Sequence, residues 1–102
     1  GRCWSDPRLV LCTYPNSQAS LRVGYSVSKR IGGAVRRNRI KRLMRESIRA
    51  YCDLLEPGWD IVIIARQKVS LANYWDVQGS VGHLLGLGGV FGVVDAPGKV
   101  LG

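Results

Sequence analysis

The chain has 102 residues, of which 46% are hydrophobic, and its formal net charge is +8. This length suits one domain and leaves little room for two, and the apolar content is too high for a disordered chain. A charge this positive is typical of proteins that bind nucleic acid or anionic membrane surfaces.

The first third of the chain predicts two strands. Residues 8–14, RLVLCTY, are rich in β-formers and end at the turn signal Pro15-Asn16. Residues 21–28, LRVGYSVS, alternate bulky with small side chains, which predicts a half-buried strand. We expect the two strands to pair as an antiparallel hairpin. The face lined by Gly and Ser would let another backbone come close.

A long amphipathic helix is predicted after the Gly32-Gly33 pair. Apolar residues recur three and four positions apart from Val35 to Leu55, and Pro57-Gly58 ends the pattern. The stripe comprises Val35, Ile40, Leu43, Met44, Ile48, Tyr51, Cys52 and Leu55. The sequence therefore predicts a helix of about five turns with one side toward the core.

Two further elements complete the predicted fold. Residues 59–65, WDIVIIA, form a continuous apolar run that predicts a buried central strand. A weaker helix is expected from about residue 72 to residue 85. The order strand, strand, helix, strand, helix predicts the α+β class: a small single-domain sandwich of helices on a mixed sheet.

The positive charge is concentrated on the long helix. Ten of the 15 basic residues lie between Arg22 and Arg49, with Glu46 as the single acid in that segment. Like charges three and four positions apart repel one another on a helix, so a face of one sign predicts an anionic partner. A membrane would compete with the sheet for the apolar stripe, and guanidinium groups suit phosphate. Nucleic acid is therefore favoured over a membrane.

The C-terminal part carries a long uncharged segment. Residues 77–94 contain no Asp, Glu, Lys or Arg, but six of them are Gly. Each Gly disfavours a helix by about 1 kcal/mol relative to Ala, so a frayed helix followed by a loose tail is favoured over a membrane span. We predict a domain over 1–87 and a Gly-rich, poorly ordered tail over 88–102.

The three cysteines, Cys3, Cys12 and Cys52, form no C-x-x-C motif. Without a recognisable secretory signal, reduced thiols in a cytoplasmic protein are the simpler interpretation. Together with His83 they lack the spacing of a zinc finger or ribbon, so no metal site is predicted.

One segment indicates a protein family more specifically than the net charge does. The run RVGYSVSKRIGGAVRRNRIKRLMRE, from Arg22 to Glu46, closely resembles the signature of the bacterial ribonuclease P protein subunit. That family carries an R-x-G-x-x-V-S-K-K strand, a G-x-A-V turn and an R-N-x-x-K-R-x-x-R helix. The likeness continues more loosely through GWDIVIIAR to the last predicted helix.

The resemblance implies a fold and a function. The family has an unusual left-handed crossover between the strand and the motif helix. Its protein binds a large catalytic RNA and the 5′ leader of precursor tRNA, and the RNA with its Mg²⁺ ions cleaves the leader off. No protein-borne catalytic residue, no protein-bound cofactor and no obligate protein partner are expected. A ribosomal-type RNA-binding protein is the alternative.

The resemblance also implies two sets of site residues. The set facing the catalytic RNA is Arg36, Arg37, Asn38, Arg39, Lys41, Arg42 and Arg45, with Lys29 and Arg30 at the mouth of the leader groove. The set lining the leader-binding face is Val10, Cys12, Gly24, Ser26 and Ser28.

The sequence departs from the family pattern in two places. Nothing in it corresponds to the N-terminal helix whose aromatic residues form the other wall of the leader groove. Cys12 stands where an aromatic residue is common. Loss of that stacking platform predicts a weaker hold on a leader base, by about 1–3 kcal/mol.

Overall fold

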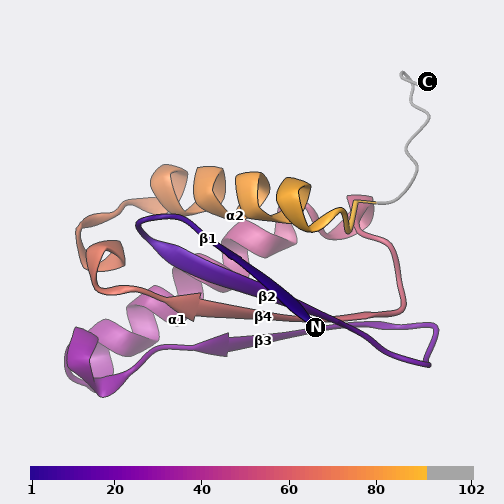
Figure 1. Ribbon diagram of the computed structural model, residues 1–102. Coiled ribbons are helices and arrows are strands. Elements are labelled where there is room, and N and C mark those ends of the chain that lie inside the picture. Colours follow the sequence, from indigo (N-terminus) through magenta and orange to yellow (C-terminus); the bar gives the residue numbers. More distant parts are fainter. Residues whose placement is uncertain (92–102) are drawn as a thin grey trace.

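The computed structural model describes residues 1–91 as four strands and two α-helices, with short 3₁₀ turns between them (Figure 1). In chain order the elements are β1 (Arg2–Ser5), β2 (Leu9–Pro15), β3 (Leu21–Ser26), η1 (Lys29–Ile31), α1 (Ala34–Arg49), η2 (Cys52–Leu54), β4 (Trp59–Ala65), η3 (Gln67–Leu71) and α2 (Tyr74–Gly88). The predicted α+β class and the mixed sheet are confirmed.

The sheet has the strand order β1-β2-β4-β3, and β4 is antiparallel to β2 but parallel to β3. The predicted hairpin of residues 8–14 with residues 21–28 is therefore wrong, because β4 lies between these two strands. The loop between β2 and β3 passes the start of β4 and is fixed there by two backbone hydrogen bonds. Asn16 donates to the Gly58 carbonyl at 2.8 Å, and Gly58 donates to the Ser20 carbonyl at 2.8 Å.

Strand β1 was not predicted from the sequence. It pairs antiparallel with β2 through a turn in which the Asp6 Oδ1 accepts the backbone N–H groups of Arg8 and Leu9, both at 2.8 Å. This is the turn chemistry typical of Asp, and the Asp6-Pro7 pair is its visible signal in the sequence. A strand of four residues leaves too short a pattern to detect.

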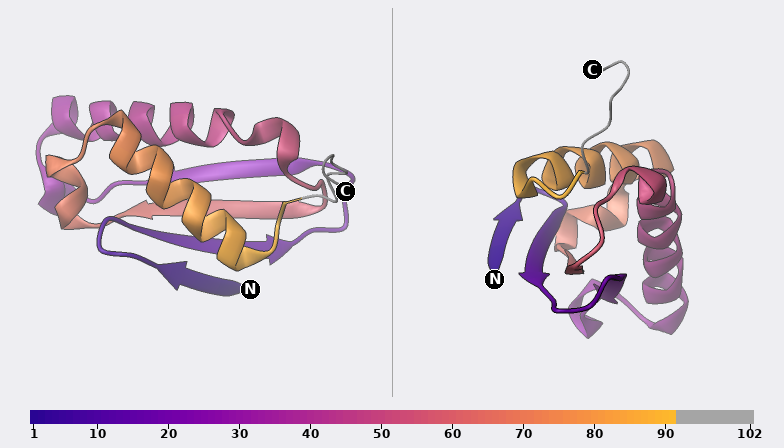
Figure 2. Two further views of the ribbon diagram at one scale, coloured as in Figure 1. Left: turned by 90° about the horizontal axis from the view of Figure 1, so that it is seen from above. Right: turned by 90° about the vertical axis from the view of Figure 1, so that its right-hand side faces the viewer.

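The connection from β3 through α1 to β4 is a crossover between parallel strands. In the left panel of Figure 2 the helix side of the sheet faces the viewer, β4 points to the left, and it lies below β3. Turning that view until the strands point upward places β4 to the left of β3. The crossover is therefore left-handed, the rare sense that the family resemblance implies.

Both helices cover the same face of the sheet and bury the core against it (Figure 2). The residues that are fully or almost fully buried there include Leu9, Leu11, Ile40, Met44, Ile48, Ile61, Ile63, Val77, Val81, Leu84 and Leu85. Helix α1 is shorter than predicted and ends at Arg49, and its Val35 is 87% exposed rather than part of the core stripe. Within residues 1–91 the other face of the sheet carries no helix.

Helix α2 begins and ends with well-defined caps. The Asn73 side chain accepts the backbone N–H of Asp76, while Asp76 accepts that of Asn73, a capping box that fixes the start. Gly89 ends the helix with a φ of 66°, which favours glycine. Val90 is fully buried and Phe91 forms a bridge with Leu55. The rest of the predicted tail, 92–102, lies outside the described residues.

Candidate nucleic-acid interface

Helix α1 presents most of the predicted RNA-binding side chains to solvent. Arg36, Asn38, Arg39, Arg42 and Arg45 are exposed, and so are Lys29 and Arg30 in the turn before the helix, whereas Arg37 and Lys41 are half-buried. The Ser28 hydroxyl accepts the backbone N–H of Arg30 at 3.2 Å and so caps η1. The structure therefore brings this predicted set together on α1 and the turn that precedes it.

The cations of α1 have no carboxylate partners within residues 1–91. The two ion pairs of that region are Arg8–Asp76 at 3.9 Å and Arg22–Asp60 at 2.7 Å, and neither includes a residue of α1. A solvated face normally mixes signs, and internal pairs would neutralise the charge. The basic arc of α1 is therefore free to bind an external anion.

Two arginines of α1, Arg37 and Arg45, differ from the others in their burial or contacts. The Arg37 Nε is buried and has no acceptor among the described residues, which is unusual because buried donors are nearly always paired. The Arg45 guanidinium lies 5.8 Å from the Tyr25 ring centroid, in cation–π geometry. Burial raises the Tyr25 pKa, although Arg45 and Arg49 pull it the other way, so the phenol stays neutral. Arg45 is thus held against β3.

The helix-free face of the sheet is built from the alternate residues of each strand. The strand register places Ser5, Val10, Ile64 and Ser26 in one row across the sheet, Cys3, Cys12, Val62 and Gly24 in the next, and Tyr14, Asp60 and Arg22 in the third. Four of the five residues predicted for the leader-binding face lie in these rows. The fifth, Ser28, lies just beyond β3. We call the three rows the open face.

Sequence reasoning missed the contribution of β4 to the open face. Val62 and Ile64 lie at its centre, between the residues of β2 and β3 that were predicted. Their alternation with buried Ile61 and Ile63 was hidden, because β4 is apolar on both sides. The open face is therefore more apolar at its centre than a lining of Gly and Ser implies.

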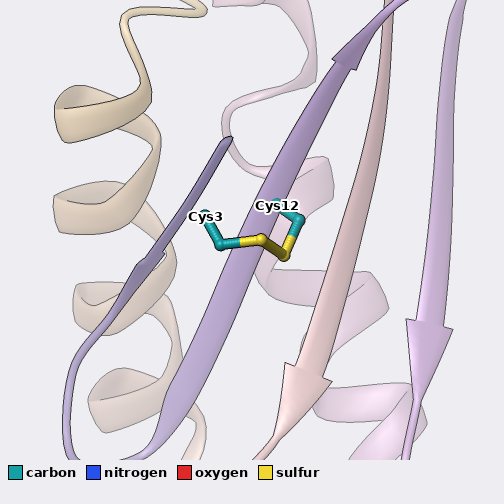
Figure 3. Close-up of a disulfide and its surroundings, with 2 residues drawn as sticks. All are labelled: Cys3 and Cys12. Atoms are coloured by element: carbon teal, nitrogen blue, oxygen red, sulfur yellow. A yellow bond between two sulfur atoms is a disulfide. The ribbon is translucent and has the colours of Figure 1, made fainter. Parts of the chain in front are cut away.

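Cys3 and Cys12 form a disulfide that joins β1 to β2 on the open face (Figure 3). The prediction of reduced thiols is wrong for these two residues, whereas Cys52 is free and exposed. The register of β1 places Cys3 directly opposite Cys12, with 4.0 Å between their Cα atoms. Because β1 was not predicted, this pairing was not predictable either.

Asp60 places one acidic group on the open face. Its carboxylate accepts two hydrogen bonds from the Arg22 guanidinium, at 2.8 and 2.7 Å, and one from the Asn16 amide at 2.8 Å. The hydrogen bonds from Arg22, and then from Asn16, hold the Asp60 pKa below its usual range. Arg22 is therefore occupied by an internal partner rather than free for phosphate.

We expect Asp60→Asn to raise affinity for a single-stranded RNA by roughly two- to fivefold at low salt, because it removes one negative charge and releases Arg22.

The stability that the Asp60 carboxylate contributes is present above its unfolded-state pKa and is lost as the pH falls through the lower folded-state value. Unfolding of the wild type should show that loss at acidic pH, and the variant should lack this component. Equal RNA affinity for both proteins would contradict the release of Arg22.

Within residues 1–91 no three His, Cys, Asp or Glu side chains gather as potential metal ligands. No helix in the same range combines the length and the apolar character needed to cross a bilayer.

Comparison with known proteins gives a consistent result. The family model described as Ribonuclease P matches residues 1–87. The ribonuclease P protein component of Dehalococcoides mccartyi strain CBDB1 is 45% identical over 86 residues, which are 84% of this chain and 70% of that protein. The component from D. mccartyi strain ATCC BAA-2266 is 49% identical over 77 residues, which are 76% of this chain and 62% of that protein.

The solved structures agree with the sequence comparison. The Staphylococcus aureus RNase P protein superposes with a TM-score of 0.82 at 34% identity, over 90% of this chain and 84% of that chain. The Thermotoga maritima RNase P protein gives 0.76 at 31% identity, over 83% and 81%. These likenesses decide against the ribosomal-type alternative. The chain belongs to the bacterial ribonuclease P protein family, whose members are protein subunits of an RNA-catalysed endoribonuclease that matures the 5′ end of tRNA.

Proposed function

We propose that α1 docks on ribonuclease P RNA through the basic residues of its motif. The docking set is Arg36, Arg37, Asn38, Arg39, Lys41, Arg42 and Arg45, with Lys29 and Arg30 beside it at the entrance to the open face. One observation carries this proposal: within residues 1–91, a helix dense in arginine has no ion pair of its own. Guanidinium groups bind phosphate in bidentate fashion, so a folded RNA backbone is the matching surface.

We further propose that the 5′ leader of precursor tRNA runs along the open face. Val10, Gly24 and Ser26 offer small or apolar side chains there, and Ser28 follows at the end of β3. Cys12 lies in the same rows but is only 4% exposed. A Cβ added to Gly24 would meet no atom within 4 Å, which leaves room for a backbone to approach. Cys12 contributes a disulfide in place of an aromatic ring, so contact here relies on shape rather than stacking.

In this proposal the protein and the RNA have different tasks in the reaction. The protein binds and orients, and the RNA with its Mg²⁺ ions supplies the reacting groups. Only the precursor carries a leader, so contact with the leader favours precursor over mature tRNA and lets the cleaved product leave. In this proposal the protein acts in the cytoplasm, binds no cofactor itself and needs no other protein partner.

Reconstitution with ribonuclease P RNA tests the leader proposal. We expect the wild-type complex to bind precursor tRNA more tightly than mature tRNA, and Gly24→Val to lower that preference by about tenfold, the equivalent of 1.4 kcal/mol. Valine fills the space above the strand while it suits β-structure, so the variant should unfold with a free energy unchanged or roughly 0.5–1 kcal/mol higher. Binding to both tRNAs and thermal unfolding are the measurements.

A matched control is Gly79→Ala on α2. A Cβ at Gly79 also meets no atom within 4 Å, but this position lies on a helix at the other side of the sheet. It should leave the preference for precursor tRNA unchanged. If Gly24→Val kept the full preference as well, the leader would not lie on the open face.

A further inference from the structure

Tyr25 lies on the helix side of β3 and contacts the docking helix. Its partner in β4 is Ile63, which is fully buried beneath the helices, so the Tyr25 side chain points away from the open face. The Arg45 guanidinium lies 5.8 Å from the Tyr25 ring centroid, and α1 runs along β3 in the left panel of Figure 2. The Tyr25 ring therefore supports the Arg45 side chain.

Arg45 is held there without losing its charge or its hydrogen-bond donors. A cation–π contact depends on the electrostatic field of the ring, and it leaves the N–H groups of the guanidinium available for an acceptor. Arg22 shows the contrast, because its donors go to the Asp60 carboxylate at 2.8 and 2.7 Å. Within residues 1–91 Arg45 has no ion pair. It is thus ordered before RNA binds and still able to bind a phosphate.

Arg49 is a second cation beside the same ring. It is exposed, it is the last residue of α1, and it follows Arg45 by four positions, which makes the two neighbours on the helix surface. Burial raises the Tyr25 pKa, and the charges of Arg45 and Arg49 oppose that rise, so both guanidinium groups lie close to the phenol. Arg49 has no ion pair within the described residues either. The two like charges repel each other until an anion joins them.

We propose that Arg45 and Arg49 together bind one phosphate of ribonuclease P RNA, with Tyr25 as the positioning residue that holds Arg45 for it. The inference rests on the proposed docking of α1, and it extends the docking set by one turn to the C-terminal end of the helix. Fixing a long, flexible side chain in advance lowers the entropic cost of ordering it in the complex. Arg49 also suits the negative end of the helix dipole, so its role is judged by RNA binding rather than by stability.

Variants of Tyr25 in the full chain test the positioning role. We expect Tyr25→Leu to weaken binding of ribonuclease P RNA roughly three- to tenfold, because Arg45 must then be ordered during binding. Tyr25→Phe should bind within about twofold of the wild type, since it keeps the ring. Tyr74→Leu is the control and should bind as the wild type does. It also removes a half-buried tyrosine ring, but that ring packs against Trp75 on α2.

A double-mutant cycle separates positioning from a structural effect. In the Arg45→Ala background, Tyr25→Leu should change the RNA affinity by less than about twofold, because the side chain that Tyr25 positions is gone. A tyrosine that only stabilised the fold would weaken binding by the same factor in both backgrounds. That result, or wild-type affinity of Tyr25→Leu itself, would overturn the positioning role.

Variants of the two arginines test the shared phosphate. We expect Arg49→Ala to weaken binding of ribonuclease P RNA roughly three- to tenfold. Removing Arg45 and Arg49 together should make the slope of log K against log salt shallower by about 0.7–0.9, the value for one phosphate. A change of about 1.4–1.8 would indicate two separate phosphates and overturn the sharing, and wild-type affinity of Arg49→Ala would overturn the role of Arg49. A wild type that bound no RNA would instead overturn the docking proposal itself.

Discussion

Replacing Arg39 and Arg42 with alanine together is expected to weaken assembly with ribonuclease P RNA by about ten- to hundredfold at moderate salt. Both side chains are exposed, and neither forms an ion pair within the described residues, so truncation removes no internal ion pair. Their separation of three positions makes them repelling neighbours on α1, and their removal should stabilise the helix by a few tenths of a kcal/mol. The fold should therefore survive while the docking weakens.

The salt dependence of binding shows whether the double variant has lost contacts with phosphate groups. Each neutralised phosphate contributes about −0.7 to −0.9 to the slope of log K against log salt, so the double variant should show a slope shallower by roughly 1.4–1.8. Arg2→Ala serves as the control. It removes a cation from β1 at the other edge of the sheet, where the guanidinium lies 5.4 Å from the Trp4 ring centroid. An unchanged affinity and slope in the double variant would place the RNA elsewhere.

The parts of the molecule that local patterns encode were predicted well. The helical period of α1 placed Ile40, Met44 and Ile48 in the core, as the structure confirms. It left the arginines outside, and all of those on α1 except the half-buried Arg37 are exposed. The alternation in β3 likewise assigned Gly24 and Ser26 to the side of the sheet without helices. Both patterns depend on neighbours within a few positions in the sequence, which is why they can be detected without knowledge of the fold.

The parts that depend on distant segments were not predicted. Two consecutive strands most often pair, yet the strand encoded by residues 59–65 inserts between them, since a strand apolar on both sides is best buried at the centre of a sheet. Val62 and Ile64 lie on the open face because β4 is inserted between β2 and β3. Val35 was assigned to the core because its spacing fits the helical period, but it is 87% exposed. A period alone does not show where the contact of a helix with the sheet begins.

Opening the disulfide between Cys3 and Cys12 is expected to cost about 2–3 kcal/mol of unfolding free energy, because the bond closes a loop with a sequence separation of 9 and restricts the unfolded chain. For a domain of this size that corresponds to a fall in Tm of roughly 10–20 °C. Cys3→Ser should show this fall without reductant, and the wild type should show it when dithiothreitol is added. Thermal unfolding followed by circular dichroism measures both.

The variants of the three cysteines separate the bond from other thiol effects. Cys52→Ser should unfold as the wild type does, since Cys52 is exposed and unbonded. Because β1 is an edge strand joined to β2, loosening it should disturb the open face and lower the preference for precursor tRNA. Binding of ribonuclease P RNA by α1 should persist, since α1 connects β3 to β4 at the far edge. If Cys3→Ser and the oxidised wild type unfolded at the same temperature, the bond would contribute nothing to stability, and β1 would be held by its ladder and Trp4 alone.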